Sequence, residues 1–304
     1  MAVASTWSST VPRATTASCW RRRPWPNPSS PSSTRSKSTR SNAAAEVPEL
    51  LEVEAYRRAA EALVGSTITA VEAPDDWYLK GVDAATVSDA LVGSRIEGVR
   101  RHGKLLLVDT DGPVLGLRFG MTGRLLVDGE APIERLEYGS SRDEPAWDRF
   151  RLRVDDGREL VVRDPRRLGG VELDPDESRL GPDAATVDLR TFRRVLAGGH
   201  APVKARLMDQ SRLAGLGNLL VDEILWRAGV APGRPVDSLD DDEIRRLHRA
   251  LRRTLELLGR RGGSHRGDLG PERHPGGTCP RDGTPLERSS AGGRTGWWCP
   301  THQR

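Results

Sequence analysis

Residues 205–229 read ARLMDQSRLAGLGNLLVDEILWRAG, and this stretch carries the clearest signal of architecture. Apolar residues recur at helical spacing in 201–210 and again in 217–229, and glycines lie between the two runs. We therefore expect two helices joined by a tight turn. A helix that begins after such a turn offers free backbone N–H groups to a phosphate, and glycine allows a close backbone approach. Glycine turns between helices are also common elsewhere, so the turn alone leaves both interpretations open.

Helical patterns continue on both sides of this stretch. Residues 188–198 and 239–261 have apolar residues at helical spacing, and Gly262-Gly263 closes the last run. Residues 49–64 read as a further amphipathic helix. Between that helix and Pro182, β-rich runs follow one another without helices, which predicts an α+β protein with an antiparallel β-sandwich followed by a helical domain. The β-rich runs are 67–73, 94–109, 113–120, 123–128, 149–154, 159–164 and 170–174.

Length and composition exclude several classes of protein. The chain has 304 residues, of which 36% are hydrophobic, and this length suits two domains with their own cores. It holds no run of about 20 apolar residues, so we expect no membrane-spanning helix. Its three cysteines are too few to staple a secreted domain. Residues 1–46 hold seven Arg or Lys and one acidic residue, whereas the rest of the chain holds 40 basic and 42 acidic residues. The rest of the chain therefore has no excess of positive charge, and any surface that binds nucleic acid depends on where its charges lie.

Residues 1–46 are rich in Ser, Thr, Pro and Arg and have no apolar periodicity, so we predict that they lie outside the fold. Three interpretations are open. The segment is a disordered arm, an organellar transit peptide of the Arg- and Ser-rich, acid-poor type, or upstream sequence translated from a wrongly chosen start. The chemistry of the residue at position 48 favours the third interpretation.

The segment PELLEVE, residues 48–54, resembles the N-terminus of the formamidopyrimidine-DNA glycosylase/endonuclease VIII family. Taken alone, the segment also fits the ordinary start of a helix, with proline and acidic residues in the first turn. In the family the mature chain begins with proline and then glutamate. The resemblance therefore implies that Pro48 is the nucleophile and Glu49 the general acid–base at the deoxyribose. A free α-amino group titrates near a pH of about 8, against about 10.4 for lysine, so more of it is uncharged at neutral pH.

This chemistry requires Pro48 to be the first residue of the chain. A proline nitrogen inside a chain is a tertiary amide and has no nucleophilic lone pair. Val47 precedes it, and a valine codon can initiate translation and be read as methionine. We therefore expect the working protein to start at Val47, with removal of the initiator exposing Pro48.

Three motifs in the β part, HGK (102–104), RFGMTGR (118–124) and RDPRRLGG (163–170), resemble elements of the same family in the same order. The resemblance implies that Lys104 joins Pro48 and Glu49 in the catalytic set by holding a phosphate. It also implies that Met121 enters the base stack beside an everted nucleotide, although a core position is the competing interpretation. Family members usually have an aromatic residue at the position of Leu168. The predicted DNA contacts are Met121, Arg166, Arg167, Leu168, Lys204, Asn218 and Arg294.

The segment 274–304 is too polar and glycine-rich for a hydrophobic core and needs another staple. Family members commonly carry C-x2-C-x16-C-x2-C, a structural zinc hairpin. Thiolates, carboxylates and imidazoles all bind zinc, so we predict a Zn²⁺ site. His274 is an alternative fourth ligand, and a metal-free hairpin supported by Trp297 and Trp298 is the competing interpretation. The residues at the expected spacing are Cys279, Asp282, Cys299 and His302.

Together these motifs imply a bifunctional DNA glycosylase and abasic-site lyase of base excision repair. Such an enzyme excises oxidised bases from damaged double-stranded DNA and cuts the strand by β,δ-elimination, without a redox or nucleotide cofactor. We expect a monomer in the bacterial cytoplasm, associated with the nucleoid through DNA. The alternative is a damaged-DNA-binding module without catalysis. The expected parts are an extension (1–46), a catalytic β-sandwich (48–178), a helix–two-turn–helix domain (182–263) and a zinc-finger-type hairpin (274–304).

Two signals disagree about the damaged base. PELLEVE resembles the members that act on purines, although Leu51 stands where those members usually have proline. Purine-specific members also carry a long loop before the zinc hairpin, and 262–277 is too short for such a cover. Oxidised pyrimidines, ring-opened purines and abasic sites therefore all remain candidates.

Overall fold

The computed structural model describes residues 48–133 and 144–304, and all of them belong to one compact unit. The predicted extension over 1–46 and the expected start at Val47 lie outside these residues. None of the described helices is both long enough and apolar enough to cross a membrane.

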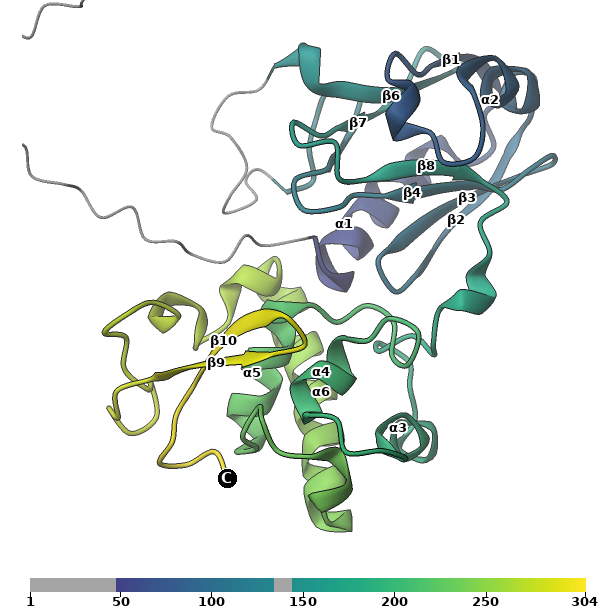
Figure 1. Cartoon of the computed structure of the whole chain (residues 1–304). Coiled ribbons are helices and arrows are strands. Elements are labelled where there is room, and N and C mark those ends of the chain that lie inside the picture. Colours follow the sequence, from purple (N-terminus) through teal and green to yellow (C-terminus); the bar gives the residue numbers. More distant parts are fainter. Residues whose placement is uncertain (1–47, 134–143) are drawn as a thin grey trace, which may run out of the picture. The chain divides into compact units, whose positions relative to one another are not determined.

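Two four-stranded antiparallel sheets form the N-terminal part (Figure 1). One sheet has the strand order β1-β6-β7-β5 and the other β2-β3-β4-β8. Their inward-facing residues, among them Leu106, Leu117, Phe150 and Val162, share one buried cluster, as in a β-sandwich. The strands are β1 (Ile68–Glu72), β2 (Ile96–His102), β3 (Leu105–Thr110), β4 (Leu115–Arg118), β5 (Arg124–Val127), β6 (Asp148–Val154), β7 (Glu159–Arg163) and β8 (Gly170–Leu173).

Helix α1 (Leu50–Ala60) links the sandwich to the helical part. Its residues Val53 and Tyr56 are buried in the sandwich core, whereas Leu50 is buried in the core of the helices. Helix α2 (Ala84–Leu91) lies against β1 and is capped by Asp83, whose carboxylate accepts from the N–H of Thr86 at 2.7 Å. The sequence patterns predicted α1 but not α2.

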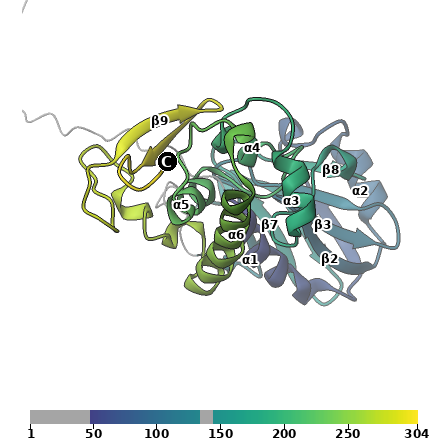
Figure 2. The same cartoon turned by 90° about the horizontal axis from the view of Figure 1, so that it is seen from below.

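Four helices follow; Figure 1 shows them below the strands of the sandwich, and Figure 2, which looks from below, shows them in front of the fainter strands. Their apolar faces meet in a second buried cluster that includes Phe192, Leu207, Leu220 and Leu251. A two-stranded hairpin of β9 (Glu287–Ala291) and β10 (Arg294–Trp298) ends the chain, and β10 contacts α5. These elements confirm the predicted α+β fold with helices and a C-terminal hairpin. The helices are α3 (Leu189–Leu196), α4 (Val203–Met208), α5 (Asn218–Ala228) and α6 (Asp241–Arg261).

Candidate active site

Glu49 is held between two helices that are far apart in the sequence. It is the N-cap of α1, and it is only 1% exposed because its carboxylate enters the N-terminus of α5. There it accepts hydrogen bonds from the backbone N–H groups of Gly217 (2.7 Å) and Leu219 (2.8 Å). A methyl group at Gly217 would lie 2.4 Å from the Glu49 carboxyl carbon, so glycine is needed for this approach. The turn predicted from the glycines thus binds a carboxylate of the protein itself.

Burial raises the pKa of the Glu49 carboxyl from 4.5 to about 7. Lys104 and the backbone N–H groups of Leu219 and Gly217 lower this pKa, and the negative charge of Glu52 raises it. The cost of removing an ionised carboxylate from water exceeds the stabilisation from its hydrogen bonds and from the nearby amine. Glu49 can therefore both hold and release a proton near neutral pH, as a general acid–base must.

The raised pKa makes the stability of the full chain depend on pH. Because the folded pKa exceeds the unfolded value, the native state keeps a proton that the unfolded chain releases between pH 4.5 and about 7. Stability is therefore lost as pH rises through this window, by about 3 kcal/mol at 1.36 kcal/mol per unit. Glu49→Gln removes this pH dependence. In urea unfolding, the free energy of unfolding of the variant relative to that of the parent should therefore rise by about this amount from pH 4 to pH 8. Parallel pH profiles would contradict this.

Lys104 lies beside Glu49 in the tight turn between β2 and β3. The turn is fixed by Asp183, whose carboxylate accepts from the N–H of Gly103 at 2.7 Å. Lys104 itself forms no hydrogen bond and no ion pair within 4 Å in the described ranges. Burial lowers the pKa of its amine, the carboxylates of Glu49 and Glu52 raise it, and Arg294 lowers it, with a net decrease. Among the described residues, the charge of Lys104 is therefore not used in an ion pair within the protein.

A cavity of about 550 Å³ brings most of the predicted residues together. Its volume is within the range of small-molecule sites, about 300–1,000 Å³. Pro48 is buried and lines a neighbouring hollow of about 250 Å³ together with Leu168, and Lys104 lines both. The predicted residues that line the larger cavity are Glu49, Lys104, Met121, Asn218 and Arg294. Residues from the sandwich, the helices and the hairpin therefore meet at one site.

Asn218 is the first residue of α5 and lies at the wall of this cavity. Its side-chain oxygen is buried and has no hydrogen-bond partner among the described residues. Buried polar groups normally have a partner. This oxygen can therefore accept a hydrogen bond from a ligand, whereas a phosphate would need the N–H groups of the same amide as donors.

Asp164 joins the two loops that carry Met121 and Leu168, and our sequence reasoning did not single it out. It is fully buried and accepts from the hydroxyl of Thr122 at 2.6 Å. It also accepts from the N–H groups of Leu168 and Gly169, both at 2.9 Å, and of Arg166 at 3.1 Å. Leu168 remains 48% exposed, so the loop presents this side chain to solvent. The only signal in the sequence was the aspartate inside RDPRRLGG.

Replacing Asp164 by Asn should loosen both loops. In either orientation the new amide places N–H groups against backbone N–H donors, and an unsatisfied buried group costs about 1–3 kcal/mol. Thr122→Val, which removes one of the bonds, is the milder control. We expect slower base excision from Asp164→Asn, with a smaller loss on a preformed abasic site, where no base must be displaced. Single-turnover kinetics on both substrates measure this, and equal losses on the two substrates would contradict it.

Lys204 does not occupy the position that the prediction requires. It is 0% exposed, and its amine lies 2.7 Å from the carboxylate of Asp222, which also pairs with Arg273 at 2.9 Å. Asp222 additionally accepts a 3.4 Å hydrogen bond from the N–H of Trp297 in β10. The predicted DNA contact of Lys204 is therefore wrong for this structure, because the amine is enclosed by an ion-pair network that attaches the hairpin to the helices.

Glu52 is buried next to the site. One of its oxygens accepts from the N–H of Glu49 at 2.9 Å, which completes a capping box at the start of α1. Its carboxylate also accepts from the N–H of Ser264 at 2.6 Å and from the Ser264 hydroxyl at 2.8 Å. Glu52 thus ties the start of α1 to the segment that follows α6.

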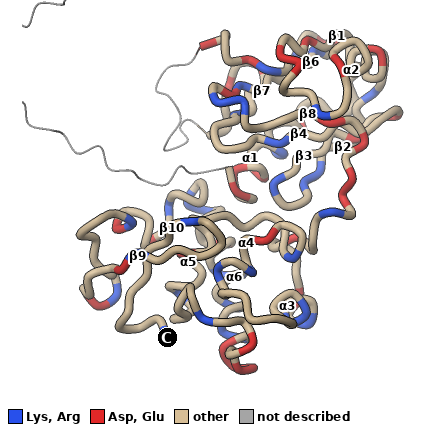
Figure 3. The backbone as a smooth tube through the Cα atoms, in the orientation of Figure 1, with Lys and Arg blue, Asp and Glu red and all other residues tan. Residues whose placement is uncertain are grey.

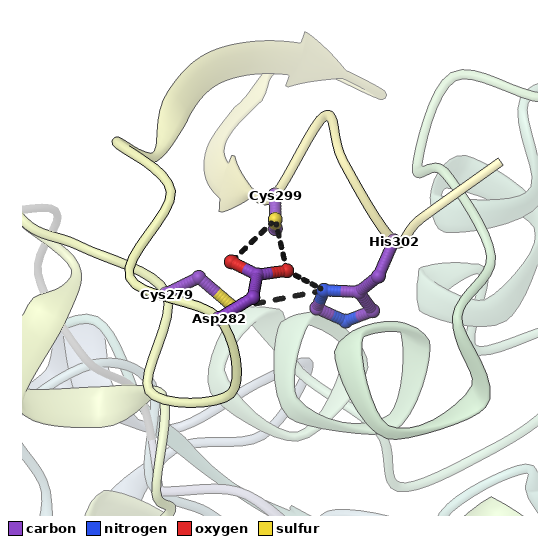
Figure 4. Close-up of side chains that lie close together, drawn as sticks. All are labelled: Cys279, Asp282, Cys299 and His302. Atoms are coloured by element: carbon purple, nitrogen blue, oxygen red, sulfur yellow. Dashed lines mark hydrogen bonds and ion pairs between the residues drawn. The ribbon is translucent and has the colours of Figure 1, made fainter.

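The four predicted metal ligands lie together at the base of the hairpin (Figure 4). Their candidate donor atoms are all within 4.8 Å of one another. Nε2 of His302 lies 3.1 Å from the carbonyl oxygen of Trp226, so Nδ1 is free to bind a metal. His274 is not a member of this cluster, and its Nδ1 lies 3.0 Å from the carbonyl of Pro275. Two sulfurs, a carboxylate and an imidazole form a donor set that suits a divalent zinc-like ion.

Of the other predicted contacts, Arg166 and Arg167 are exposed next to Leu168, and Arg294 is exposed at the start of β10. Arg167 has a positive φ of 56° and pairs with Asp75 at 2.5 Å. The described site thus offers a proton-exchanging carboxyl, an amine without a partner and exposed guanidinium groups around one cavity. This combination suits acid–base chemistry on a polyanion.

Comparisons with known proteins agree with this geometry. The N-terminal domain of formamidopyrimidine-DNA glycosylase matches residues 47–171, and the H2TH domain of the same enzyme matches residues 180–265. Formamidopyrimidine-DNA glycosylase of Streptococcus mutans is 33% identical over 288 residues, which cover 85% of this chain and all of the relative. That of Heliobacterium modesticaldum is 35% identical over 284 residues, with the same coverage.

Solved structures give the same result. A complex of Lactococcus lactis Fpg with DNA that contains FAPY-dG superimposes with a TM-score of 0.70 and 26% identity, over 84% of this chain and all of that one. A complex of the same enzyme with abasic-site DNA has a TM-score of 0.70 and 26% identity, over 84% and 99%. The chain belongs to the formamidopyrimidine-DNA glycosylase/endonuclease VIII family.

Proposed function

We propose that this protein is a DNA glycosylase of base excision repair that is also an abasic-site lyase. The observation that carries the proposal is the cavity in which buried Glu49, with a pKa of about 7, lies beside Lys104 and Asn218 and next to Pro48. A site built only to hold DNA has no need of a carboxyl that is costly to bury. Such perturbed groups in a cavity are typical of catalysis.

The reaction begins when the free amine of Pro48 attacks C1′ of the damaged nucleotide. The C1′–N bond breaks, and the base leaves with the electron pair and takes up a proton. Glu49 gives a proton to the ring oxygen, the sugar opens, and the proline nitrogen becomes an iminium, the Schiff base. Loss of a C2′ proton expels the 3′-phosphate, and a second proton loss expels the 5′-phosphate. Water then hydrolyses the iminium and releases Pro48.

DNA is held and distorted by the residues around the cavity. Met121 and Leu168 fill the space of the everted nucleotide, with Arg166 beside them, which offsets part of the few kcal/mol that flipping costs. Asn218 and Arg294 hold phosphates near the lesion, and Lys104 holds one beside Glu49. Arg167 contacts the backbone. Because leucine stacks less well on bases than an aromatic ring does, Leu168 makes a weaker wedge than the usual residue.

The four-residue cluster in the hairpin holds structural Zn²⁺ in this proposal. Cys279 and Cys299 supply thiolates, and Asp282 and His302 complete the donor set. When bound, the ion staples the hairpin and takes no part in the reaction. It thereby fixes Arg294 at the cavity.

Metal analysis tests this assignment. The purified protein should hold about one zinc per chain. Cys299→Ser should lose the metal and bind DNA more weakly, because Arg294 is no longer fixed. His274→Ala is the matched control and should keep both. Zinc loss in His274→Ala, or unchanged DNA affinity in zinc-free protein, would contradict the assignment.

The enzyme acts as a monomer in the cytoplasm of a bacterium, with 48–178 as the catalytic part, 182–263 as the DNA clamp and 274–304 as the zinc hairpin. Asp222 of the clamp accepts a 3.4 Å hydrogen bond from the N–H of Trp297 in the hairpin. The monomer assignment can be checked by light scattering on the DNA complex.

A lesion panel tests the function and selects the substrate. Protein that begins at Pro48 is incubated with duplexes containing 8-oxoguanine, a ring-opened purine, an oxidised pyrimidine or an abasic site. We expect strand breaks with phosphate at both ends for at least one base lesion and for the abasic site. Tight binding to these duplexes without any cleavage would contradict catalysis and support a damaged-DNA-binding module.

A further inference from the structure

A second hollow, of about 290 Å³, lies at the opposite end of α5 from the active-site cavity. Apart from Ala250, every residue that lines it is an arginine: Arg227, Arg246, Arg249, Arg253 and Arg281. Asn218 at the first residue of α5 lines the active-site cavity, and Arg227 is nine residues further on. At 1.5 Å per residue the two sites are about 14 Å apart along the helix.

The fold holds these arginines around the hollow in two ways. Arg246, Arg249 and Arg253 are three and four residues apart on α6 and so share one face of that helix. Figure 3 shows basic residues along α6 and acidic residues gathered at its N-terminal end. From the opposite side, the guanidinium carbons of Arg227 and Arg281 lie 5.7 Å and 5.2 Å from the centre of the Trp226 ring.

Most of this charge is not neutralised by the protein. Arg227 pairs with Glu223 at 2.7 Å and with Asp268, and Arg246 lies 3.7 Å from Glu243. In the described part of the chain, the other three arginines have no acidic group within 4 Å. Asp242 is influenced by the charge of Arg249 but pairs with Arg245 at 2.8 Å. Three uncompensated positive charges around one hollow repel one another unless an anion joins them.

The geometry points to a phosphate-binding site. Guanidinium groups bind phosphate through paired hydrogen bonds, and several of them around one hollow can surround a single phosphate or diphosphate. The lining offers no carboxylate and, beyond Ala250, no apolar wall for a base or a lipid chain. The phosphate belongs either to a second nucleic-acid segment or to a small phosphorylated molecule. The site is independent of the proposed glycosylase reaction, because no residue of the active-site cavity lines it.

The test uses the full chain and the variant Arg249→Gln/Arg253→Gln, whose side chains are exposed. Arg245→Gln/Arg260→Gln is the matched control, since it removes the same charge from α6 outside the hollow. Calorimetry with inorganic phosphate and with pyrophosphate measures the site directly. We expect at least tenfold weaker binding in the variant and less than twofold change in the control. Equal affinity in parent and variant, or no binding to the parent, overturns the proposal.

A second titration distinguishes the sources. Parent protein saturated with one unlabelled undamaged duplex is titrated with a labelled second duplex at low salt. A second bound duplex that the variant loses identifies a nucleic-acid ligand, whereas phosphate binding without a second duplex identifies a small phosphorylated ligand. Binding of polyglutamate without phosphate or pyrophosphate overturns the phosphate assignment. If lesion DNA is not cleaved at all, the proposed function fails while these titrations still decide the site.

Discussion

A Glu49→Gln protein that begins at Pro48 is expected to cleave lesion DNA about 10²–10⁴-fold more slowly than its parent, the usual contribution of a general acid–base. Glutamine keeps the size of the side chain, but its one amide oxygen can accept from the N–H of Gly217 or from that of Leu219, not from both, because these groups donate to different oxygens of Glu49. It cannot hand a proton to the sugar oxygen. The loss should therefore appear in the rate of the chemical step and leave DNA affinity within a fewfold range.

Single-turnover cleavage and binding to an uncleavable abasic-site analogue separate the two quantities. Glu54→Gln is the matched control, because Glu54 lies on the same helix but pairs with Arg57 and Arg58 outside the cavity. It should cleave at the parental rate. Parental cleavage by Glu49→Gln would show that the carboxyl plays no part in the reaction.

Blocking the nitrogen of Pro48 should have a still larger effect. A single glycine placed before Pro48 turns the amine into an amide, which has no nucleophilic lone pair, so the covalent route is closed. We expect strand cleavage to fall to the background of the DNA alone. The full chain, in which residues 1–47 precede Pro48, should be equally inactive.

Because Pro48 is buried, an added residue also changes packing, and a second variant separates the two causes. Pro48→Gly as the first residue supplies a free primary amine in place of the secondary amine of proline, adds no bulk, and should recover part of the cleavage. The intact mass of active protein from its native source gives the natural start. Active enzyme whose mass includes residues before Pro48 would exclude this nucleophile.

The sequence predicted those elements whose residue pattern lies within one short stretch of the chain. Alternating runs predicted the strands to within about two residues, except that the single run 94–109 forms two strands, β2 and β3, joined by the turn at Gly103-Lys104. The helices α3 to α6 follow their apolar periodicity in the same way. Helix α2 was missed because eight residues give only two turns, too few for a clear period, and its cap by Asp83 is an unremarkable aspartate in the sequence.

The sequence could suggest candidate residues for the site but not the hydrogen bonds and ion pairs that these residues form. Glu49 was identified by its place after proline, yet its partners lie 168 and more residues away, so its burial and raised pKa are products of the fold. Lys204 resembled a DNA contact because any lysine in a helical DNA-binding segment does. Only the position of Asp222, one helix later, shows that its charge is used inside the protein.

Reduction with borohydride during the reaction, followed by peptide mapping, identifies the residue that forms the Schiff base with the sugar. Protein that begins at Pro48 is mixed with lesion DNA, and the trapped complex is digested and analysed by mass spectrometry. We expect one covalent adduct, on the nitrogen of Pro48. An adduct on Lys104, whose amine lies in the same cavity and whose pKa is also lowered, would contradict this expectation, as would cleavage without any adduct.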